Sequence, residues 1–377
     1  MRTLLRCSFV ALLVTVAVLA GCGGSTVDTG GPAGPGTSGG SGGGTGGGSG
    51  DGTGGGSGGA TGDGTGGGTS GGAPLGWRPF SADSPWNTPI PANPLLDPNS
   101  AALVADLASS SPWGPHLDVN VEDWSVPVYW ADASTPTFQV LAHVGGDGWT
   151  GTDGMEATGT MPIPPGATPD PAGDAHMAVV DRARGLEWGC WDMRLEGGRW
   201  VAGLCATADL SGAGVRPPAT SARPWTAAHG ARACGYPLLA GLIRVDEIEA
   251  GRIDHALVIA YPHIRSGWFT PPASTGSARG SANGIPCGGR IQLDPALDLD
   301  ALGLSRTGKI IARALQTYGA YVGDYSGAID LFAENGPTAL ARWRDGVLST
   351  YELKDRIDLS RLRVLQAERL YDNGNGG

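Results

Sequence analysis

The stretch Leu186–Asp209, LEWGCWDMRLEGGRWVAGLCATAD, contains the clearest structural signal in the sequence. Gly197-Gly198 divides it into two runs with β-strand character, and a two-residue Gly-Gly turn supplies the positive φ that a tight hairpin needs at both central positions. Counting outward equally from this turn places Cys190 opposite Cys205. The turn and the cysteines agree, so the sequence predicts an antiparallel hairpin closed by a Cys190–Cys205 disulfide.

The remaining cysteines of the folded part are Cys234 and Cys287. With Cys190 and Cys205 paired, these two form the second predicted disulfide. An even number of cysteines that pair in this way indicates an oxidising compartment.

The hairpin belongs to a longer antiparallel meander. Its expected strands are His176–Asp181, Leu186–Glu196 and Arg199–Asp209. Alternate side chains of a strand point to opposite faces, and one face gathers the larger apolar residues and the disulfide, so we expect it to face the core. The other face carries small residues around His176, Glu187 and Trp191. Small side chains leave room for a ligand, and this face is therefore a candidate groove floor.

Outside the meander the pattern favours short strands over helices. The expected strands are 137–144, 255–261, 289–293, 321–324, 328–333 and 360–365, and the expected helices are 100–108, the second half of 238–251, and 306–318. Helices are few and scattered. The sequence therefore predicts a mainly β fold, an antiparallel β-sandwich or jelly-roll-like domain with a few short helices.

The N-terminus carries an export signal. Arg2 and Arg6 precede a short apolar run, Phe9–Leu19, which is too short to span a bilayer as a mature helix. Leu19-Ala20-Gly21-Cys22 follows and resembles the lipobox of bacterial lipoproteins, in which the cysteine becomes the acylated first residue. The alternative is an ordinary secretory signal with a chance cysteine.

These features divide the chain into three parts. Residues 1–21 are the expected signal peptide, residues 22–73 a lipidated cysteine and a Gly/Ser/Thr-rich tether, and residues 74–377 one folded β-rich domain. The expected location is the cell envelope, with the chain held to the membrane through Cys22 and facing outside the cytoplasm.

Composition excludes some classes of function. The chain has a formal net charge of -11, which makes it a poor partner for nucleic acid. It contains no G-x-S-x-G, no H-E-x-x-H, no phosphate-binding loop and no Cys/His zinc spacing. No cofactor and no metal are predicted. Candidate chemistry therefore rests on groups of polar residues.

Asp174 and His176 stand at the junction that opens the meander. Two residues apart in a strand, they point to the same face, where a carboxylate can orient an imidazole as a general base. The alternative is a turn-capping Asp174 and a His176 packed against Trp191. A metal site formed by Asp174, His176 and His255 is a further option, although their spacing matches no metal motif.

His255 and Asp324 are the other catalytic candidates. His255 enters an apolar strand, where a polar side chain needs a partner, and Asp324 ends a strand, where a carboxylate can act as acid, base or nucleophile. The alternatives are a core histidine bonded to a backbone carbonyl and an aspartate that caps the turn before Ser326-Gly327. Glu187 is a weaker candidate, because a strand glutamate is more often solvated.

Tryptophan is unusually common, with twelve Trp against five Phe. Its flat apolar ring and polar N–H suit stacking on sugars, although core packing accounts for most of the twelve. The tryptophans in loop-like contexts are Trp86, Trp113, Trp149 and Trp268. Among all tryptophans, Trp86, Trp191 and Trp268 are the predicted ligand-binding residues.

Four segments carry a family resemblance. They are S-P-W-N at 84–87, D-x-H-M-x-V-x-D at 174–181, L-L-x-G-L-I-x-x-x-E-I-x-x-G-x-I-x-H-A-L at 238–257 and Y-G-x-Y-V-x-D at 318–324. The stretch from Asp174 to about Asp324 resembles an uncharacterised family of secreted bacterial proteins. The resemblance implies no activity, but its recurring polar residues coincide with the candidates above. The family often carries Asp-Gly after Pro-Ala beyond His255, and Pro272–Gly276 lacks that aspartate.

Two functions are compatible with this pattern. The first is an enzyme that cleaves extracellular polysaccharide, a glycoside hydrolase or a polysaccharide lyase, with His176 or His255 as base, Asp174 as its orienting partner and Asp324 as acid or nucleophile. The second is a non-catalytic surface protein that binds glycan or another envelope component. The enzyme hypothesis requires Asp174, His176, His255 and Asp324 to meet in one place.

Overall fold

The structure is a computed structural model that describes residues 76–142, 159–218, 230–336, 339, 342–343 and 352–373. All of these lie in the second of the two units into which the chain divides, Thr65–Gly377. The expected signal peptide, the lipidation site Cys22, most of the tether and Trp149 fall outside the described residues.

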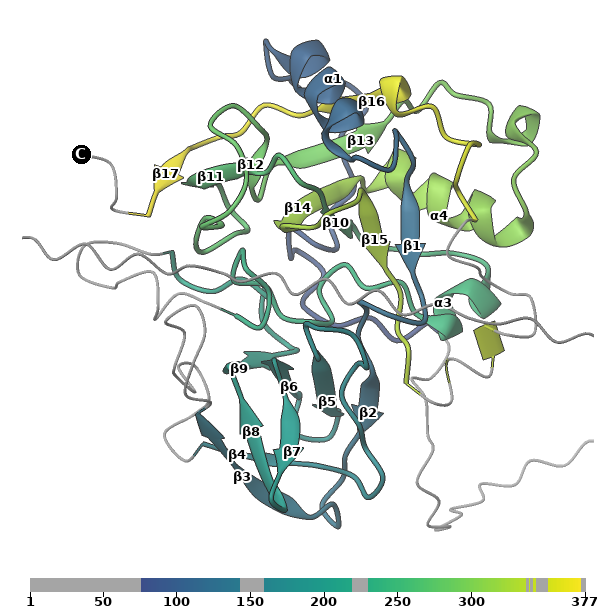
Figure 1. Cartoon of the computed structure of the whole chain (residues 1–377). Helices are drawn as coiled ribbons and strands as arrows, with labels where there is room; N and C mark the ends of the chain where they lie inside the picture. Colours follow the sequence, from purple (N-terminus) through teal and green to yellow (C-terminus); the bar gives the residue numbers. More distant parts are fainter. Residues whose placement is uncertain are drawn as a thin grey trace, which may run out of the picture. The chain divides into compact units, whose positions relative to one another are not determined.

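The predicted meander contributes strands to both sheets of a small β-sandwich (Figure 1). One sheet contains, in order, β2 (Val128–Trp130), β5 (Met177–Asp181), β6 (Leu186–Trp191) and β9 (Leu204–Asp209). The second contains β4 (Thr160–Pro162), β3 (Thr137–Ala142), β8 (Arg199–Ala202) and β7 (Arg194–Glu196). Side chains from both sheets share one core around the Cys190–Cys205 disulfide, as the apolar face of the meander predicts.

The hairpin keeps the predicted register but crosses from one sheet to the other. Cys190 pairs with Cys205, and both turn glycines have positive φ, 56° at Gly197 and 78° at Gly198. Each expected strand is interrupted, at Asp192 (φ 51°) and at Gly203. A Cβ at Gly203 would lie 2.5 Å from the Trp191 ring, so glycine allows the tryptophan to cover the crossing point.

A mixed six-stranded sheet organises the larger core (Figure 1). Its order is β1 (Asp118–Asn120), β15 (Asp330–Phe332), β10 (Leu257–Ala260), β14 (Ala320–Asp324), β13 (Arg290–Leu293) and β16 (Leu362–Val364). All four residues of β10 are buried, and β10 runs parallel to β14. A continuous apolar run of this kind is typical of a strand covered on both faces.

Few helices accompany these sheets. They are α1 (Ser100–Ser110), α3 (Val245–Ala250) and α4 (Arg306–Thr317), with 3-10 turns η1 (Leu299–Leu302) and η3 (Leu359–Arg361). Gly251 ends α3 in the left-handed conformation, φ 84°, as its position after the apolar run predicts. With 17 strands in four mixed sheets and three α-helices among the described residues, the mainly β fold class is confirmed.

No helix in the described ranges is both long enough and apolar enough to cross a membrane.

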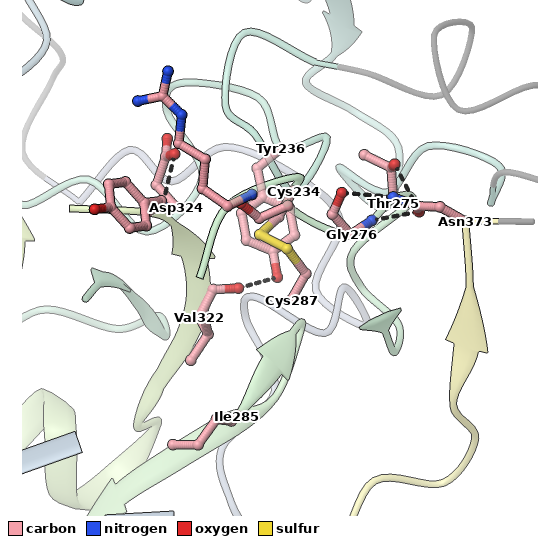
Figure 2. The surroundings of a disulfide bond; sticks show 12 residues. Cys234, Tyr236, Thr275, Gly276, Ile285, Cys287, Val322, Asp324 and Asn373 are labelled. Atoms are coloured by element: carbon pink, nitrogen blue, oxygen red, sulfur yellow. Dashed lines mark hydrogen bonds between the residues drawn. A yellow bond between two sulfur atoms is a disulfide. The ribbon is translucent and has the colours of Figure 1, made fainter. Parts of the chain in front are cut away.

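The second disulfide, Cys234–Cys287, ties a loop to β12 of a small three-stranded sheet. This sheet contains β12 (Pro286–Cys287), β11 (Arg265–Phe269) and β17 (Tyr371–Asp372). The Cys234 N–H donates to the Gly323 carbonyl at 3.2 Å, and Tyr236 O–H donates to the Val322 carbonyl at 3.1 Å, so the loop lies along β14 (Figure 2). Both predicted disulfides form, which indicates an oxidising, extracytoplasmic environment.

Candidate functional site

Three of the four candidate catalytic residues meet where three distant segments converge. Asp174 and His176 immediately precede β5, and Asp324 ends β14. The charge of Asp174 acts on both His176 and Asp324, and Arg232, from the loop before Cys234, acts on them too. We call Asp174, His176, Arg232 and Asp324 the polar cluster.

The junction before β5 is fixed to the hairpin by backbone bonds. The Asp192 N–H donates to the Asp174 carbonyl at 2.8 Å, and the Met193 N–H donates to the Ala175 carbonyl at 3.1 Å. Ala175 has φ 42°, an unusual value for a residue with a Cβ. Strained backbone held by its surroundings is common at functional sites.

His176 is buried and electrically neutral at neutral pH. Its Nε2 lies 3.2 Å from the Ala231 carbonyl, which can only accept, so the proton of the neutral ring is on Nε2. Burial lowers the pKa of His176 to about 4, against an opposing effect of the Asp174 charge, while Arg232 lowers it further. Nδ1 therefore carries a lone pair, and within the described part of the chain it has no hydrogen-bond partner.

The pKa of Asp324 is shifted in the opposite direction, upward. Burial, and next the charge of Asp174, raise the pKa of Asp324 to about 7, although Arg232 and the Tyr325 N–H, 2.9 Å away, favour the charged form. The residue remains partly exposed. A neutral base and a carboxyl group that keeps its proton near neutral pH thus lie in one cluster.

Arg232 is the member that the sequence did not single out. It is 1% exposed, and none of its three guanidinium nitrogens has a hydrogen-bond partner among the described residues. Its guanidinium carbon lies 4.1 Å from the centre of the Phe332 ring. Burial lowers the pKa of Arg232, and the charges of Asp324, Glu187 and Asp174 raise it. Proximity in sequence to Cys234 was the only available signal.

Trp191 borders the polar cluster, and the other two tryptophans do not. Its Nε1–H donates to the Asp174 carboxylate at 3.3 Å, and the ring is partly exposed. Trp86 is 1% exposed in the larger core, where its Nε1–H donates to the Gly214 carbonyl. Trp268 lies in β11 under the guanidinium of Arg265, in a different sheet.

Glu187 is buried, although a solvated side chain was expected. It accepts from the Leu238 N–H at 2.6 Å and the Leu239 N–H at 3.4 Å, and burial raises the pKa of Glu187 to about 7. It borders a small hollow of about 10 Å³ together with Gly189 and Ala206, which is room for about one water molecule. The small-residue face of the meander is therefore covered, and it does not form the groove floor that the sequence predicted.

His255 lies in a separate buried network of charges. Its Nε2 is 2.9 Å from Glu247, and its Nδ1 is 2.9 Å from the Ala256 carbonyl. Arg244 binds Glu247 at 2.9 Å and Asp246 at 3.2 Å within the same network. The structure thus gives His255 the buried, partnered environment that was the alternative interpretation of this residue.

Glu334 closes this network and makes a testable contribution to stability. It accepts from the Val245 N–H at 2.9 Å, and burial raises the pKa of Glu334 from its ordinary 4.5 to about 7, against the effect of Arg244. Between these values the folded chain holds this proton and the unfolded chain does not. The contribution therefore stabilises the fold at low pH and is lost as the pH rises through 7.

For Glu334→Gln we expect the free energy of unfolding to fall less steeply between pH 5 and pH 7.5 than in the parent chain. Urea unfolding at a series of pH values, followed by tryptophan fluorescence, measures this slope. His176 has a lowered pKa and acts in the opposite direction, but it is present in both chains and cancels in the difference. Identical slopes for variant and parent would contradict the prediction.

A larger hollow, of about 430 Å³, lies away from the polar cluster. Its walls come from α1, from residues 282–286 and from residues 364–370. Asp106 and Arg265 are among its charged residues, and Asp106 binds His263 at 2.9 Å. We place the candidate site at the polar cluster because that is where acid–base groups with shifted pKa values meet.

No group of three or more His, Cys, Asp or Glu side chains within the described ranges is arranged to hold a metal ion. The separation of His255 from Asp174 and His176 leaves the three-residue metal hypothesis without support.

Comparisons with protein-family models, with curated proteins and with solved structures find no match to this chain. The function is therefore inferred from the geometry of the site.

Proposed function

We propose that the folded domain cleaves glycosidic bonds in an extracellular polysaccharide, with Asp324 as the general acid and His176 as the general base. The observation that carries the proposal is the pairing of opposite pKa shifts in one cluster: His176 is neutral with an unbonded Nδ1, and Asp324 retains a proton near neutral pH. Groups whose surroundings push their pKa values apart are the usual sign of an acid–base pair.

The chemistry needs both groups at once. Breaking a glycosidic bond requires a proton on the departing sugar oxygen, which a protonated Asp324 supplies, and it requires a base on the other reacting group. The Ala231 carbonyl holds the His176 ring through Nε2, and Asp174 stabilises the charged form of the ring after proton transfer, because its charge already favours protonation of that ring. Trp191, next to Asp174, offers a partly exposed ring for a sugar to stack on.

The proposed setting is the cell surface. An acylated Cys22 would anchor the chain, and the tether would let the domain reach outward to a large, immobile target. The two disulfides are compatible with this location. An anchored enzyme suits a polymer better than a diffusing metabolite.

The test is a screen of the full chain, purified in detergent, on a panel of neutral and acidic polysaccharides. Release of reducing ends and absorbance of unsaturated products are both measured. We expect one polymer class to be cleaved, and we expect Asp324→Asn and His176→Gln each to lower kcat by about 100- to 10,000-fold.

The matched controls replace the same residue types outside the polar cluster. Asp300→Asn changes a side chain that is 84% exposed, and His263→Gln changes a histidine that is 40% exposed. Both should retain parental activity. Variants at Asp324 and His176 that cleave as fast as these controls would exclude the proposed acid and base.

A non-catalytic glycan-binding surface protein is the second candidate. The deep burial of His176, 2% exposed, and of Arg232, 1% exposed, favours it, because a reacting group must be reached by the substrate. Retention of a polysaccharide without release of any product, in the same screen, would establish this function instead.

A further inference from the structure

We infer that Arg232 is a carboxylate-binding subsite, so that the polysaccharide contains uronic acids and its bonds are broken by β-elimination. This inference rests on the proposed function and deepens it. It names the class of substrate and selects a lyase over a hydrolase.

Two buried arginines of this chain differ in their hydrogen-bond partners. Arg244 is 0% exposed and donates to Glu247, Asp246 and the Trp77 carbonyl. Arg232 is equally buried, yet no hydrogen bond to a described residue reaches its guanidinium. A buried cation without hydrogen bonds is costly, and proteins normally pair such groups. The group that completes Arg232 is therefore not one of the described residues, and we infer that it is a bound ligand.

The guanidinium of Arg232 is suited to bind a carboxylate. Its planar fork of N–H donors matches a carboxylate, which it can bind through two parallel hydrogen bonds. The ring of Phe332 lies against the guanidinium and supports it from one side. Three carboxylates, Asp324, Glu187 and Asp174, are close enough for their charges to raise the pKa of Arg232. None of them forms a hydrogen bond with its guanidinium among the described residues.

The fold fixes the position of Arg232 relative to Asp324. The loop that carries Arg232 is held against β14 by the Cys234 N–H and by the Cys234–Cys287 disulfide, which keeps Arg232 next to Asp324 (Figure 2 shows Asp324 beside this disulfide). Asp174 and Asp324 are both partly exposed, so the charges that Arg232 senses border solvent. In the proposed complex a sugar enters beside these two aspartates, with its carboxylate toward Arg232 and its ring toward Trp191.

These residues supply each part of an elimination. His176 Nδ1 takes the proton from the ring carbon that bears the carboxylate, and the electron pair of that C–H bond forms a carbon–carbon double bond to the neighbouring carbon. The bond from that neighbour to the bridging oxygen breaks, and the oxygen leaves with its electron pair. Asp324 gives its proton to this oxygen. Arg232 stabilises the negative charge that builds on the carboxylate. The step consumes no water and needs no oxidant.

Substrate binding would also strengthen the hold of Asp324 on its proton. Arg232 now favours the charged form of Asp324. A substrate carboxylate that binds Arg232 offsets this effect and adds a negative charge nearby, so the proton on Asp324 is held more tightly when the substrate is present.

The experiment compares each uronate polymer with its own carboxyl-reduced form, in which the carboxylate becomes a hydroxymethyl group. The probes are polygalacturonate, alginate and hyaluronan, with xylan and amylose as neutral polymers, and the enzyme is the full chain in detergent. We expect unsaturated product from at least one uronate polymer and none from its reduced form. Arg232→Gln should lower kcat/KM on that polymer by about 100-fold or more, while Arg232→Lys retains part of the rate.

The matched control is Arg252→Gln, because the Arg252 side chain is 69% exposed and lies in a surface ion pair. It should cleave at the parental rate. Near-ultraviolet circular dichroism establishes that each variant is folded. If Arg232→Gln does not fold, the comparison of native and carboxyl-reduced polymer still decides, because it needs only the parental chain.

Two failures can be told apart. Release of reducing ends without unsaturated product, or equal cleavage of native and carboxyl-reduced polymer, overturns the carboxylate subsite and leaves the proposed glycan cleavage intact. Failure to cleave any polymer overturns the proposed function itself, and the inference with it.

Discussion

Replacing Cys234 and Cys287 together with alanine is expected to lower the free energy of unfolding by about 4 kcal/mol. This disulfide closes a loop of 53 residues, and both cysteines are fully buried. Without the bond the unfolded chain gains the conformational freedom of that loop, which is the main contribution that a native disulfide makes. Urea unfolding of the full chain, followed by tryptophan fluorescence, measures the loss.

The Cys190–Cys205 pair provides the matched control. It is equally buried but closes only 15 residues, so the double alanine variant at these positions should lose about 3 kcal/mol. A larger loss from the short loop than from the long one would contradict loop entropy as the dominant effect. It would indicate instead that packing in the small sandwich core depends on the bond.

Replacing Arg244 with methionine is expected to lower the free energy of unfolding by about 3–5 kcal/mol. Arg244 is 0% exposed and binds two carboxylates, Glu247 at 2.9 Å and Asp246 at 3.2 Å. Methionine preserves much of the apolar volume but leaves two buried carboxylates facing each other without their cation. The loss is measured by the same urea unfolding at pH 7.

Two further variants separate charge from packing. Arg244→Met combined with Glu247→Gln should recover part of the stability, since one stranded charge is then removed. Arg252→Met breaks an exposed ion pair with Asp254 and should change stability little. No recovery in the double variant would show that Arg244 acts through packing against Trp77, whose ring lies 5.2 Å from the guanidinium, and not through its ion pairs.

Local signals in the sequence were sufficient for the disulfide-closed hairpin of the small sandwich. Gly197 and Gly198 determine a turn, the turn determines which residues face each other, and that register brings Cys190 and Cys205 together. Each step depends on neighbours in sequence. The crossing between two sheets at Gly203 was not predicted, because it depends on how the Trp191 ring packs in three dimensions.

The candidate site was only partly predictable, for the same reason. Asp174, His176 and Asp324 occupy strand ends, a position that the pattern of apolar residues reveals, and the structure brings these three together. His255 occupies an equivalent position in sequence but finds Glu247 instead. Arg232 lies in a segment without periodicity, and only the fold shows that it is buried without a partner.

Trp86 shows that the residues around a tryptophan do not establish whether its ring is exposed. Its flanking prolines and asparagine suggest a loop at the surface, and it does follow a turn. The ring nevertheless inserts between Tyr236 and Tyr321, with centroid distances of 4.7 and 5.1 Å. Irregular backbone around a tryptophan therefore does not distinguish a ligand platform from a core anchor.

The Cys234–Cys287 disulfide also affects when the newly made chain reaches its final structure. Arg232 and Ala233 directly precede Cys234, so the bond that holds Cys234 against β14 also holds two residues that act on Asp324. A newly made chain in a reducing cytoplasm lacks this bond. The polar cluster would then reach its final form only once the chain is in an oxidising compartment, where the bond can form.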